Sequence, residues 1–356
     1  MSEPITSADK KAALVTGAAG FLGSHLCEKL LKAGYFVIGV DNLSTGMSSN
    51  IDELNAIAQS ISEIDKTGSS WSKNFKFVFI NADVTNDWTW KNKIPGDWLE
   101  NLKYIFHFAS PASPPLYQKL AFETIKVNTV GLEKALHFAK DHGARLIFAS
   151  TSEIYGDPLS SPQKESYWGN VNSFGPRSCY DESKRLGETL IFEFNKKYGA
   201  KHGLVRIFNT YGPRMNPTDG RVVINFLMQG LKGQSLTVHG DGKQSRCFCY
   251  VDDLIAGIWS YAQKDLFEPI NIGSEFEFSV LELAQQVQKI FPDKNLKIEF
   301  IKRPTDDPQV RRPDLTKARA ELAPWNSATP LEVGLIHLLD WLKNDLADLD
   351  LKNLPI

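Results

Sequence analysis

Residues 15–23 read Val15-Thr16-Gly17-Ala18-Ala19-Gly20-Phe21-Leu22-Gly23 and lie between an apolar run and an amphipathic segment. The apolar run Ala12–Thr16 predicts a buried strand, and Phe21–Lys32 predicts the helix that follows it. Glycines at this spacing permit a tight turn, close approach of a pyrophosphate and close packing of the helix on the sheet. The helix N-terminus would then face the phosphates, so the segment predicts a dinucleotide site.

Further apolar runs alternate with helix-like segments over the first two thirds of the chain. The expected strands after the first are Phe36–Val40, Phe75–Ile80, Tyr104–Ala109, Arg145–Ala149 and Gly203–Phe208. Two further helices are expected at Leu116–Asp141 and Tyr180–Tyr198. Short apolar strands that alternate with helices are typical of a parallel sheet buried on both faces. The expected fold class is therefore α/β, with a doubly wound parallel sheet of the Rossmann type.

The sequence changes character after about residue 210, where Gly and Pro become frequent and the expected elements shorten. We expect a dinucleotide-binding domain over residues 1–210 and a smaller α/β substrate-binding cap over 211–356, partly interleaved with it. Residues 50–73 and 87–102 are expected to be insertions in the first domain. The sequence of residues 50–73 predicts a helix with a loop, and that of residues 87–102 predicts a surface helix or loop. The expected C-terminal strands are Leu236–Val238, Phe248–Val251 and Lys297–Phe300, and the helices are Val280–Ile290 and Leu331–Leu342.

Composition excludes several classes of protein. The formal net charge of the 356 residues is -2, which does not indicate a nucleic-acid partner. The four cysteines form no CxxC pair and the histidines no HExxH motif, so no metal site is expected. No apolar run approaches the roughly 20 residues that span a membrane. Met1–Lys10 lacks the apolar region of a signal peptide, and a reducing, cytoplasmic location is expected.

The second expected strand ends at Asp41, which bears on the choice of cofactor. A carboxylate at this place accepts hydrogen bonds from ribose hydroxyls and repels a 2′-phosphate, so NAD is favoured over NADP. Asp83 follows the third strand and could reach the adenine or cap a helix. The residues expected to bind the cofactor are Gly17, Gly20, Phe21, Leu22, Gly23, Asp41, Asn42, Thr45, Gly46, Asp83, Val84, Phe108, Ser110, Tyr180 and Lys184.

Tyr180 and Lys184 are four residues apart and would share one face of a helix. A lysine cation close to a phenol favours the phenolate, so the pKa of Tyr180 is expected to be lowered and the residue to act as a base. The fifth strand ends in Thr151-Ser152-Glu153, at the sheet edge where open α/β folds bind ligands. Thr151 and Ser152 can polarise a reacting oxygen there. Glu153 is a second acid–base candidate or a buried structural acid.

The sequence resembles the extended short-chain dehydrogenases and, among them, the UDP-glucuronate decarboxylases, also called UDP-xylose synthases. The stretches Ser110–Pro115 (SPASPP) and Thr151–Pro158 (TSEIYGDP) are the most specific. The other matching stretches are Tyr167-Trp168-Gly169, Gly175-Pro176-Arg177, Tyr180-Asp181-Glu182, Arg206–Met215, Asp219–Val223 and Asp306–Gln309 with Arg311 and Pro313. The resemblance implies NAD as the cofactor, a UDP-sugar substrate and a homodimer formed through the helices expected at 116–141 and 180–198.

The resemblance also implies a role for individual residues. Tyr180 would be the base, Lys184 its partner at the nicotinamide ribose, and Arg311 the group that faces the substrate carboxylate. The extended backbone before Pro313 would send Arg311 and Arg312 to opposite faces. Thr151, Ser152 and Glu153 would line the sugar, and Lys126, Asn209, Arg221 and Arg246 would contact the substrate. Without the resemblance, Arg221 and Arg246 could be surface ion-pair residues and Lys126 a solvated lysine.

The implied reaction is NAD-dependent decarboxylation of UDP-glucuronate to UDP-xylose through a UDP-4-keto intermediate. Oxidation at C4 would create a β-keto acid that loses carbon dioxide, and return of the hydride would leave NAD recycled. Alternatives are a decarboxylase that releases the 4-keto pentose, a 4,6-dehydratase and a 4-epimerase. An NAD-binding protein without catalysis is an alternative of another class.

Overall fold

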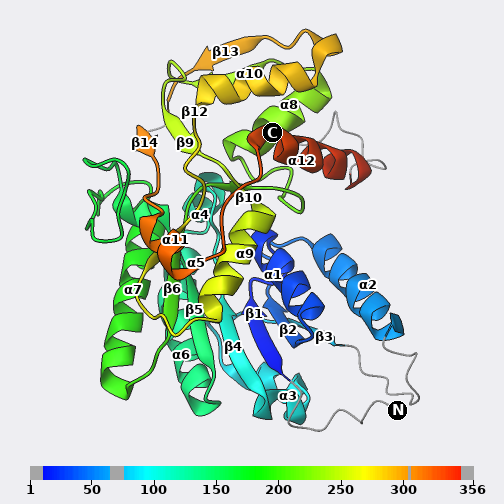
Figure 1. The fold of residues 1–356 in the computed structure, drawn as a ribbon, viewed down its shortest axis with the longest axis vertical. Helices are drawn as coiled ribbons and strands as arrows, with labels where there is room; N and C mark the ends of the chain where they lie inside the picture. Colours follow the sequence, from blue (N-terminus) through cyan, green and yellow to red (C-terminus); the bar gives the residue numbers. More distant parts are fainter. Residues whose placement is uncertain (1–10, 65–75, 304–305, 346–356) are drawn as a thin grey trace.

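The structure is a computed structural model that describes residues 11–64, 76–303 and 306–345. A seven-stranded sheet with the order β3-β2-β1-β4-β5-β6-β11 lies at its centre, and every neighbouring pair is parallel (Figure 1). The strands are β1 (Ala12–Thr16), β2 (Phe36–Asp41), β3 (Phe77–Asn81), β4 (Leu102–His107), β5 (Arg145–Thr151), β6 (Gly203–Ile207) and β11 (Ile270–Ile272). The predicted doubly wound α/β fold is confirmed.

Side chains of each central strand enter two separate hydrophobic cores, as expected for a sheet covered on both faces. On β1, Ala13 and Val15 join one core and Leu14 joins the other. The first core is covered by α1 (Phe21–Lys32), α2 (Ser48–Ile64) and α9 (Val251–Ala262), and the second by α6 (Leu132–Asp141) and α7 (Ser178–Tyr198). Because strand neighbours alternate between faces, both faces of β1 must be apolar, which is why its sequence is an unbroken apolar run.

The single helix predicted for Leu116–Asp141 is wrong. The segment forms α4 (Pro114–Lys119), α5 (Ala121–Lys126), a π-helical turn η4 (Val127–Gly131) and then α6. Leu120 separates the first two with non-helical angles, φ -113° and ψ 46°. The π turn places the buried Asn128 where its Nδ2 donates to the hydroxyls of Ser110 (3.1 Å) and Ser183 (3.0 Å). Wide turns of this kind occur often at functional sites.

Residues 87–102, which were predicted to form a surface helix or loop, contribute buried side chains to the core. They form η3 (Trp88–Lys93) and α3 (Gly96–Glu100), and both Trp90 and Trp98 are buried in the core beneath the second sheet face. Burial of two indole rings explains why a segment with so many polar residues also carries tryptophans. The helix predicted in 50–73 is α2, whereas residues 65–73 lie outside the described part, as do Met1–Lys10.

The C-terminal part of the chain contributes to the main sheet as well as to a smaller unit. Strand β11 pairs with β6, and α9 packs on α1, so residues after 210 complete the sheet layer. Strand β11 was not predicted, because it is too short for an apolar periodicity to be read from the sequence. The domain division at residue 210, with interleaving, stays a proposal.

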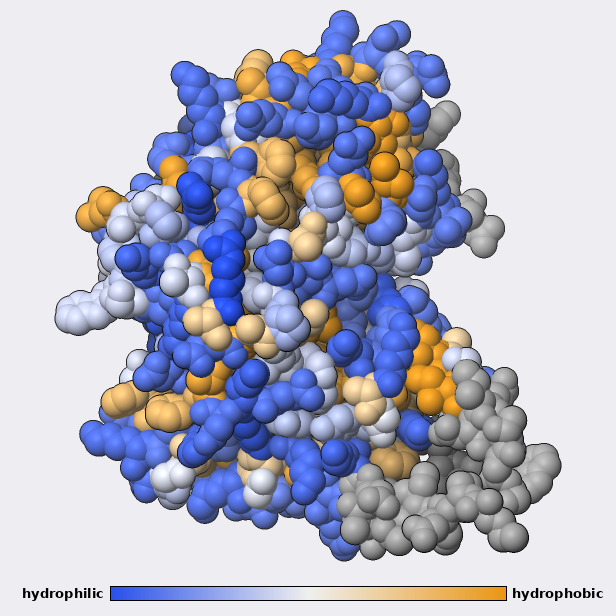
Figure 2. All heavy atoms as spheres, viewed as in Figure 1, coloured by the Kyte–Doolittle hydropathy of each residue, from blue (hydrophilic) through white to orange (hydrophobic). Residues whose placement is uncertain are grey.

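The smaller unit lies at the end of the main sheet where the carboxyl ends of the strands are (Figure 1). Its strands pair as β12-β9-β14, β13-β8 and β10-β7. Its elements are β7 (Thr210–Tyr211), α8 (Val222–Lys232), β8 (Leu236–His239), β9 (Ser245–Cys247), β10 (Cys249–Tyr250), β12 (Glu277–Ser279), α10 (Val280–Ile290), η6 (Pro292–Lys294), β13 (Ile298–Ile301), β14 (Val310–Arg311) and α12 (Leu331–Asp345). The short helix α11 (Thr316–Glu321) instead contacts β11 of the main sheet. Figure 2 shows that hydrophilic residues cover most of one face of both parts. No helix among the described residues has the length and apolar character needed to cross a membrane.

Candidate active site

The glycine loop between β1 and α1 lines a cleft. Gly17 has a left-handed backbone with φ +78°, and a Cβ atom there would lie 2.8 Å from the carbonyl oxygen of Phe108. A Cβ on Gly23 would lie 1.9 Å from the carbonyl oxygen of Gly17. Only glycine fits at either position, and the space left open suits close approach of a pyrophosphate to the backbone. The residues present therefore fit a dinucleotide.

Asp41, at the end of β2, holds this loop in place. Its carboxylate accepts hydrogen bonds from the backbone N–H groups of Ala19 (3.0 Å) and Leu43 (2.8 Å). Burial raises the pKa of Asp41 in spite of these hydrogen bonds, which favour the ionised form. Asp83 accepts from the Asn42 amide (3.2 Å) and from the backbone and hydroxyl of Thr85, so in this structure it stabilises a turn.

The cleft brings together most of the residues predicted to bind the cofactor. Those that line it are Gly17, Gly20, Phe21, Leu22, Gly23, Thr45, Phe108, Ser110, Tyr180 and Lys184. The described residues that line the cleft do not include the others predicted to bind the cofactor, which are Asp41, Asn42, Gly46, Asp83 and Val84. Gly46 instead packs close to Ala19, and Val84 lies in the core. Lining residues that the sequence did not single out for the cofactor include Met47, Asn50 and Arg214.

Tyr180 and Lys184 lie in the first turns of α7 and line the same cleft as the glycine loop. The Tyr180 ring stacks on Tyr117, with ring centroids 4.9 Å apart and planes 7° apart, and its hydroxyl hydrogen-bonds with Thr151. The ammonium of Lys184 donates to the backbone carbonyl of Ala149 (2.7 Å) and lies 5.7 Å from the centre of the Tyr180 ring. The tyrosine hydroxyl therefore lies beside the end of β5, where Thr151 and Ser152 also line the cleft.

The predicted lowering of the pKa of Tyr180 is not found in this structure. Burial raises the pKa of the Tyr180 phenol, and the hydrogen bond with Thr151 only partly opposes this. Burial also lowers the pKa of Lys184 to about 7, so the lysine charge is itself weakened. A phenolate at neutral pH therefore requires further positive charge in the cleft.

Glu153 lies at the centre of a buried ion-pair cluster. Its carboxylate contacts Arg177 Nη2 at 2.5 Å and Arg311 Nη1 at 2.8 Å. Arg311 also donates to the Ser152 hydroxyl and to the carbonyl of Gly156, each at 3.1 Å. Burial alone would raise the pKa of Glu153, but Arg311 and Arg177 outweigh it and hold that pKa well below its usual range. Glu153 is therefore ionised here, which does not favour the predicted role as an acid–base group.

A second pocket joins the cleft on the side away from the glycine loop. Asn209 and Arg221 line both spaces, and Arg246 lines the second. Arg221 forms a bidentate pair with Asp219 (2.5 and 2.8 Å), and Arg246 contacts Asp307 at 3.0 Å. The described residues that line either space do not include Lys126, which is exposed on α5, or Arg311, which is buried within the Glu153 cluster.

Sequence reasoning missed two side chains in this region. Arg177 lines the second pocket and pairs with Glu153, and Tyr117 lies against the base candidate Tyr180. Arg177 stands three residues before Tyr180, about one helical turn, in a stretch that carried the resemblance. That spacing would have placed it near the site. Tyr117 lies in the short helix α4, which the sequence did not separate from the helices that follow it.

Comparisons with known proteins agree with this geometry. Residues 13–273 match the NAD dependent epimerase/dehydratase family. The chain is 41% identical over 342 residues to UDP-glucuronic acid decarboxylase 1 of Danio rerio, covering 96% of this chain and 75% of that protein. It is 43% identical over 324 residues to UDP-glucuronic acid decarboxylase 6 of Arabidopsis thaliana, covering 90% and 86%.

A solved structure extends the agreement to three dimensions. The UDP-glucuronic acid 4-epimerase from Bacillus cereus, in complex with UDP-glucuronic acid and NAD, is 28% identical and superposes with a TM-score of 0.77 over 94% of this chain and 99% of that one. The expected resemblance to the extended short-chain dehydrogenases and the expectation of NAD as cofactor are thus confirmed. The chain belongs to the NAD dependent epimerase/dehydratase family.

Proposed function

We propose that this protein is a UDP-glucuronate decarboxylase that forms UDP-xylose and recycles NAD. The observation that carries the proposal is the similarity to decarboxylases from an animal and a plant over at least 90% of the chain. The arrangement of Tyr180, Thr151 and the Glu153 cluster around one cleft supports it. The 4-epimerase is similar at a lower identity, 28%, so epimerisation is the weaker alternative.

The first step needs a base for the C4 hydroxyl of the sugar. We propose Tyr180, because its hydroxyl reaches Thr151 at the end of β5 and can pass a proton between itself and a sugar hydroxyl. NAD, when bound, would supply the hydride acceptor and donor for C4, together with a positive nicotinamide charge that would favour the phenolate. Lys184, held by the Ala149 carbonyl, is proposed to bind the nicotinamide ribose and to keep its charge near the phenol.

Loss of carbon dioxide then follows from the chemistry of the substrate. With C4 as a ketone, the C6 carboxylate is part of a β-keto acid, and its departure leaves an enolate that Tyr180, Thr151 and Ser152 can stabilise through hydrogen bonds. C5 must then take up one proton, which comes from solvent because loss of carbon dioxide from a carboxylate consumes one. Reduction of C4 follows, and Tyr180 returns its proton to the C4 oxygen. The proposed groups at the sugar end are Asn209, Arg221 and Arg246, which line the pockets.

The substrate carboxylate requires a cation. The Glu153 cluster holds two guanidinium groups against one carboxylate, so its net charge favours an anion nearby. Arg311 remains the proposed partner of the C6 carboxylate, and it would have to exchange part of its pairing with Glu153. Arg177 already lines the second pocket, so we propose that it shares this role.

Incubation of the purified protein with carbon-13-labelled UDP-glucuronate, followed by NMR and absorbance at the NADH band, tests the proposal. UDP-xylose and carbon dioxide without net NADH are expected. A 4-keto pentose with stoichiometric NADH would indicate the releasing decarboxylase, and UDP-galacturonate without carbon dioxide would indicate a 4-epimerase. A 4-keto-6-deoxy product from UDP-glucose would indicate a dehydratase. NAD binding without any product would indicate a protein that has lost catalysis.

We also propose a homodimer through α5 and α7, which pack side by side. Phe122 on α5 and Phe192 on α7 are 75% and 65% exposed, and Ile125 and Leu186 extend the apolar surface. Phe192→Glu should convert a dimer to a monomer in analytical ultracentrifugation; a wild-type monomer would end this proposal.

A cytoplasmic location is proposed from the four free cysteines and is tested by fractionation of cells.

A further inference from the structure

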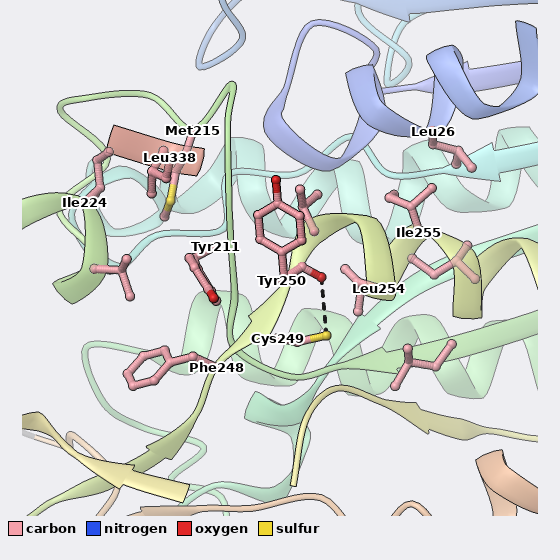
Figure 3. Close-up of a cluster of buried hydrophobic side chains, with 14 of the residues drawn as sticks. Leu26, Tyr211, Met215, Ile224, Phe248, Cys249, Tyr250, Leu254, Ile255 and Leu338 are labelled. Atoms are coloured by element: carbon pink, nitrogen blue, oxygen red, sulfur yellow. Dashed lines mark hydrogen bonds between the residues drawn. The ribbon is translucent and has the colours of Figure 1, made fainter. Parts of the chain in front are cut away.

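Residues 208–221, here called the strap, connect β6 to α8 and form a wall common to the cleft and the second pocket. Asn209, Thr210 and Arg221 line both spaces, while Arg214 and Asn216 line the cleft that contains the glycine loop. Tyr211 and Met215 point away into the hydrophobic core, where Figure 3 shows them near Ile224 of α8 and Leu338 of α12. The strap is therefore fixed to the C-terminal unit on one side and faces the cofactor cleft on the other.

Arg214 ties the strap to the opposite wall. Its guanidinium contacts Glu28 on α1 at 2.7 Å and donates from Nε to Glu53 on α2 at 2.8 Å, with a second hydrogen bond from Nη2 to Glu53. The residue is 4% exposed and has a left-handed backbone, φ 63°. A non-glycine residue seldom takes this conformation, so the ion pairs stabilise a strained turn.

The two helices that receive Arg214 also support the cofactor loop. α1 begins directly after Gly20, and the Asn50 amide of α2 donates to the Ala19 carbonyl at 2.9 Å. A second link joins the same elements, since His25 Nε2 lies 2.9 Å from the carbonyl oxygen of Pro213. Contacts between the strap and these helices thus hold the two walls of the cofactor cleft at a set distance.

We propose that Arg214 is a positioning residue that latches the strap against α1 and α2 and thereby slows the release of bound NAD. Two carboxylates already balance the charge of Arg214, which distinguishes it from an arginine reserved for a phosphate. Its importance for turnover rests on the proposed function, because a redox-neutral reaction requires the reduced cofactor to stay bound until its hydride returns to the sugar. The proposed effect of Arg214 on the release of NAD does not depend on which sugar the protein binds.

The test is the rate at which the holoenzyme loses NAD without any sugar nucleotide present. Glu53→Gln removes one ionic partner at a side chain that is 45% exposed, so the variant should fold. Diluted into an NAD-hydrolysing enzyme, it should lose bound NAD about 10-fold faster than wild type, as the loss of one partner of a charge pair acts mainly on dissociation. Asp52→Asn changes an exposed neighbour on α2 and should release NAD at the wild-type rate.

Salt and a second variant sharpen the result. Release from the wild type should accelerate with ionic strength, and release from Glu53→Gln should respond less, because the Glu53 pair is partly exposed and screened. Arg214→Gly suits the left-handed backbone and removes both ion pairs, so it should release NAD faster than Glu53→Gln. Wild-type release rates in both variants would overturn the proposal, and so would a lower kcat at saturating NAD with unchanged release. Failure to decarboxylate UDP-glucuronate would reject the proposed function and leave these release rates as a separate test.

Discussion

The glycine loop on the cofactor side of the cleft is shaped by backbone and small side chains, whereas the sugar side is built from paired charges. On the cofactor side, Gly17 and Gly23 leave no room for a Cβ atom, and Asp41 braces the loop through two backbone N–H groups. On the sugar side, Glu153 is enclosed by Arg177 and Arg311. The difference indicates that shape governs binding of the cofactor, and that charge governs binding of an anionic sugar.

The largest effect is expected where the two sides meet. Tyr180→Phe removes the proposed base and should lower the rate of decarboxylation by about 10²–10⁴-fold. NAD should stay bound, because the glycine loop and Asp41 are unchanged. The measurement is single-turnover oxidation of UDP-glucuronate together with the NAD content of the purified variant.

Tyr117→Phe is the matched control, because the Tyr117 hydroxyl is buried and has no hydrogen-bond partner among the described residues. A loss of rate below 10-fold is expected for this control. Near-normal turnover by Tyr180→Phe would remove the tyrosine from the mechanism.

The second prediction concerns two adjacent arginines on the sugar side. Arg311 is 1% exposed and pairs with Glu153, whereas Arg312 is 43% exposed and lies 3.6 Å from Glu277. Arg311→Ala should lower the free energy of unfolding by about 3–5 kcal/mol, because it leaves a buried carboxylate with one partner fewer. It should also lower kcat/KM by roughly 10²-fold. Arg312→Ala should change stability by about 0.5 kcal/mol or less.

Denaturant unfolding and carbon dioxide release measured on both variants separate structure from chemistry. A stable Arg311→Ala protein that has lost activity would place the arginine on the substrate rather than on Glu153. A destabilised protein with normal kcat/KM would make Arg311 structural and leave Arg177 as the cation for the carboxylate.

The same contrast explains what the sequence could predict. The glycine loop, α1 and the alternation of strands and helices were predictable because glycine spacing and apolar periodicity are local patterns in the sequence. Glu153 and Arg311 are 158 residues apart, and no local pattern shows that they meet. The resemblance selected both residues, yet only the structure shows that Arg311 is already paired and that Arg177 completes the cluster. The direction of the pKa shift of Tyr180 was also missed, since burial is a property of the folded chain.

The third prediction tests shape on the cofactor side. In Gly23→Ala the new methyl group would lie 1.9 Å from the Gly17 carbonyl oxygen, so the loop has to move. NAD affinity should fall by at least about 10-fold, equivalent to roughly 1.4 kcal/mol. Gly96→Ala is the matched control because nothing lies within 4 Å of a Cβ there, and NAD affinity should not change. Equal affinities in calorimetric titrations of the two variants would mean that the cofactor does not depend on this close approach.

The smallest effect is expected at Asp181, which follows Tyr180 and borders the charged cluster. The residue is buried, and its Oδ1 has no hydrogen-bond partner among the described residues. Burial first, and then the negative charge of Glu153, raise the pKa of Asp181, although Arg177 and Arg311 oppose the shift. The cluster would thus contain a neutral acid beside its ionised one.

The sign of the effect on stability follows from proton binding. Because the pKa of Asp181 is raised in the folded protein, the folded state keeps a proton that the unfolded chain releases above about pH 4. The free energy of unfolding should therefore fall as the pH rises from that value, and Asp181→Asn should remove this dependence. The free energy of unfolding of the variant should match that of wild type at pH 4. At pH 9 it should be higher than that of wild type by at least about 1 kcal/mol, which corresponds to a pKa shift of somewhat less than one unit. The charges of Glu182, Arg177 and Arg311 are present in both proteins, so the difference between the two unfolding curves isolates Asp181. A variant that is less stable than wild type at pH 9 would show that Asp181 is an anion paired with Arg177, and the sugar side would then contain two balanced ion pairs instead of one carboxylate shared by two arginines.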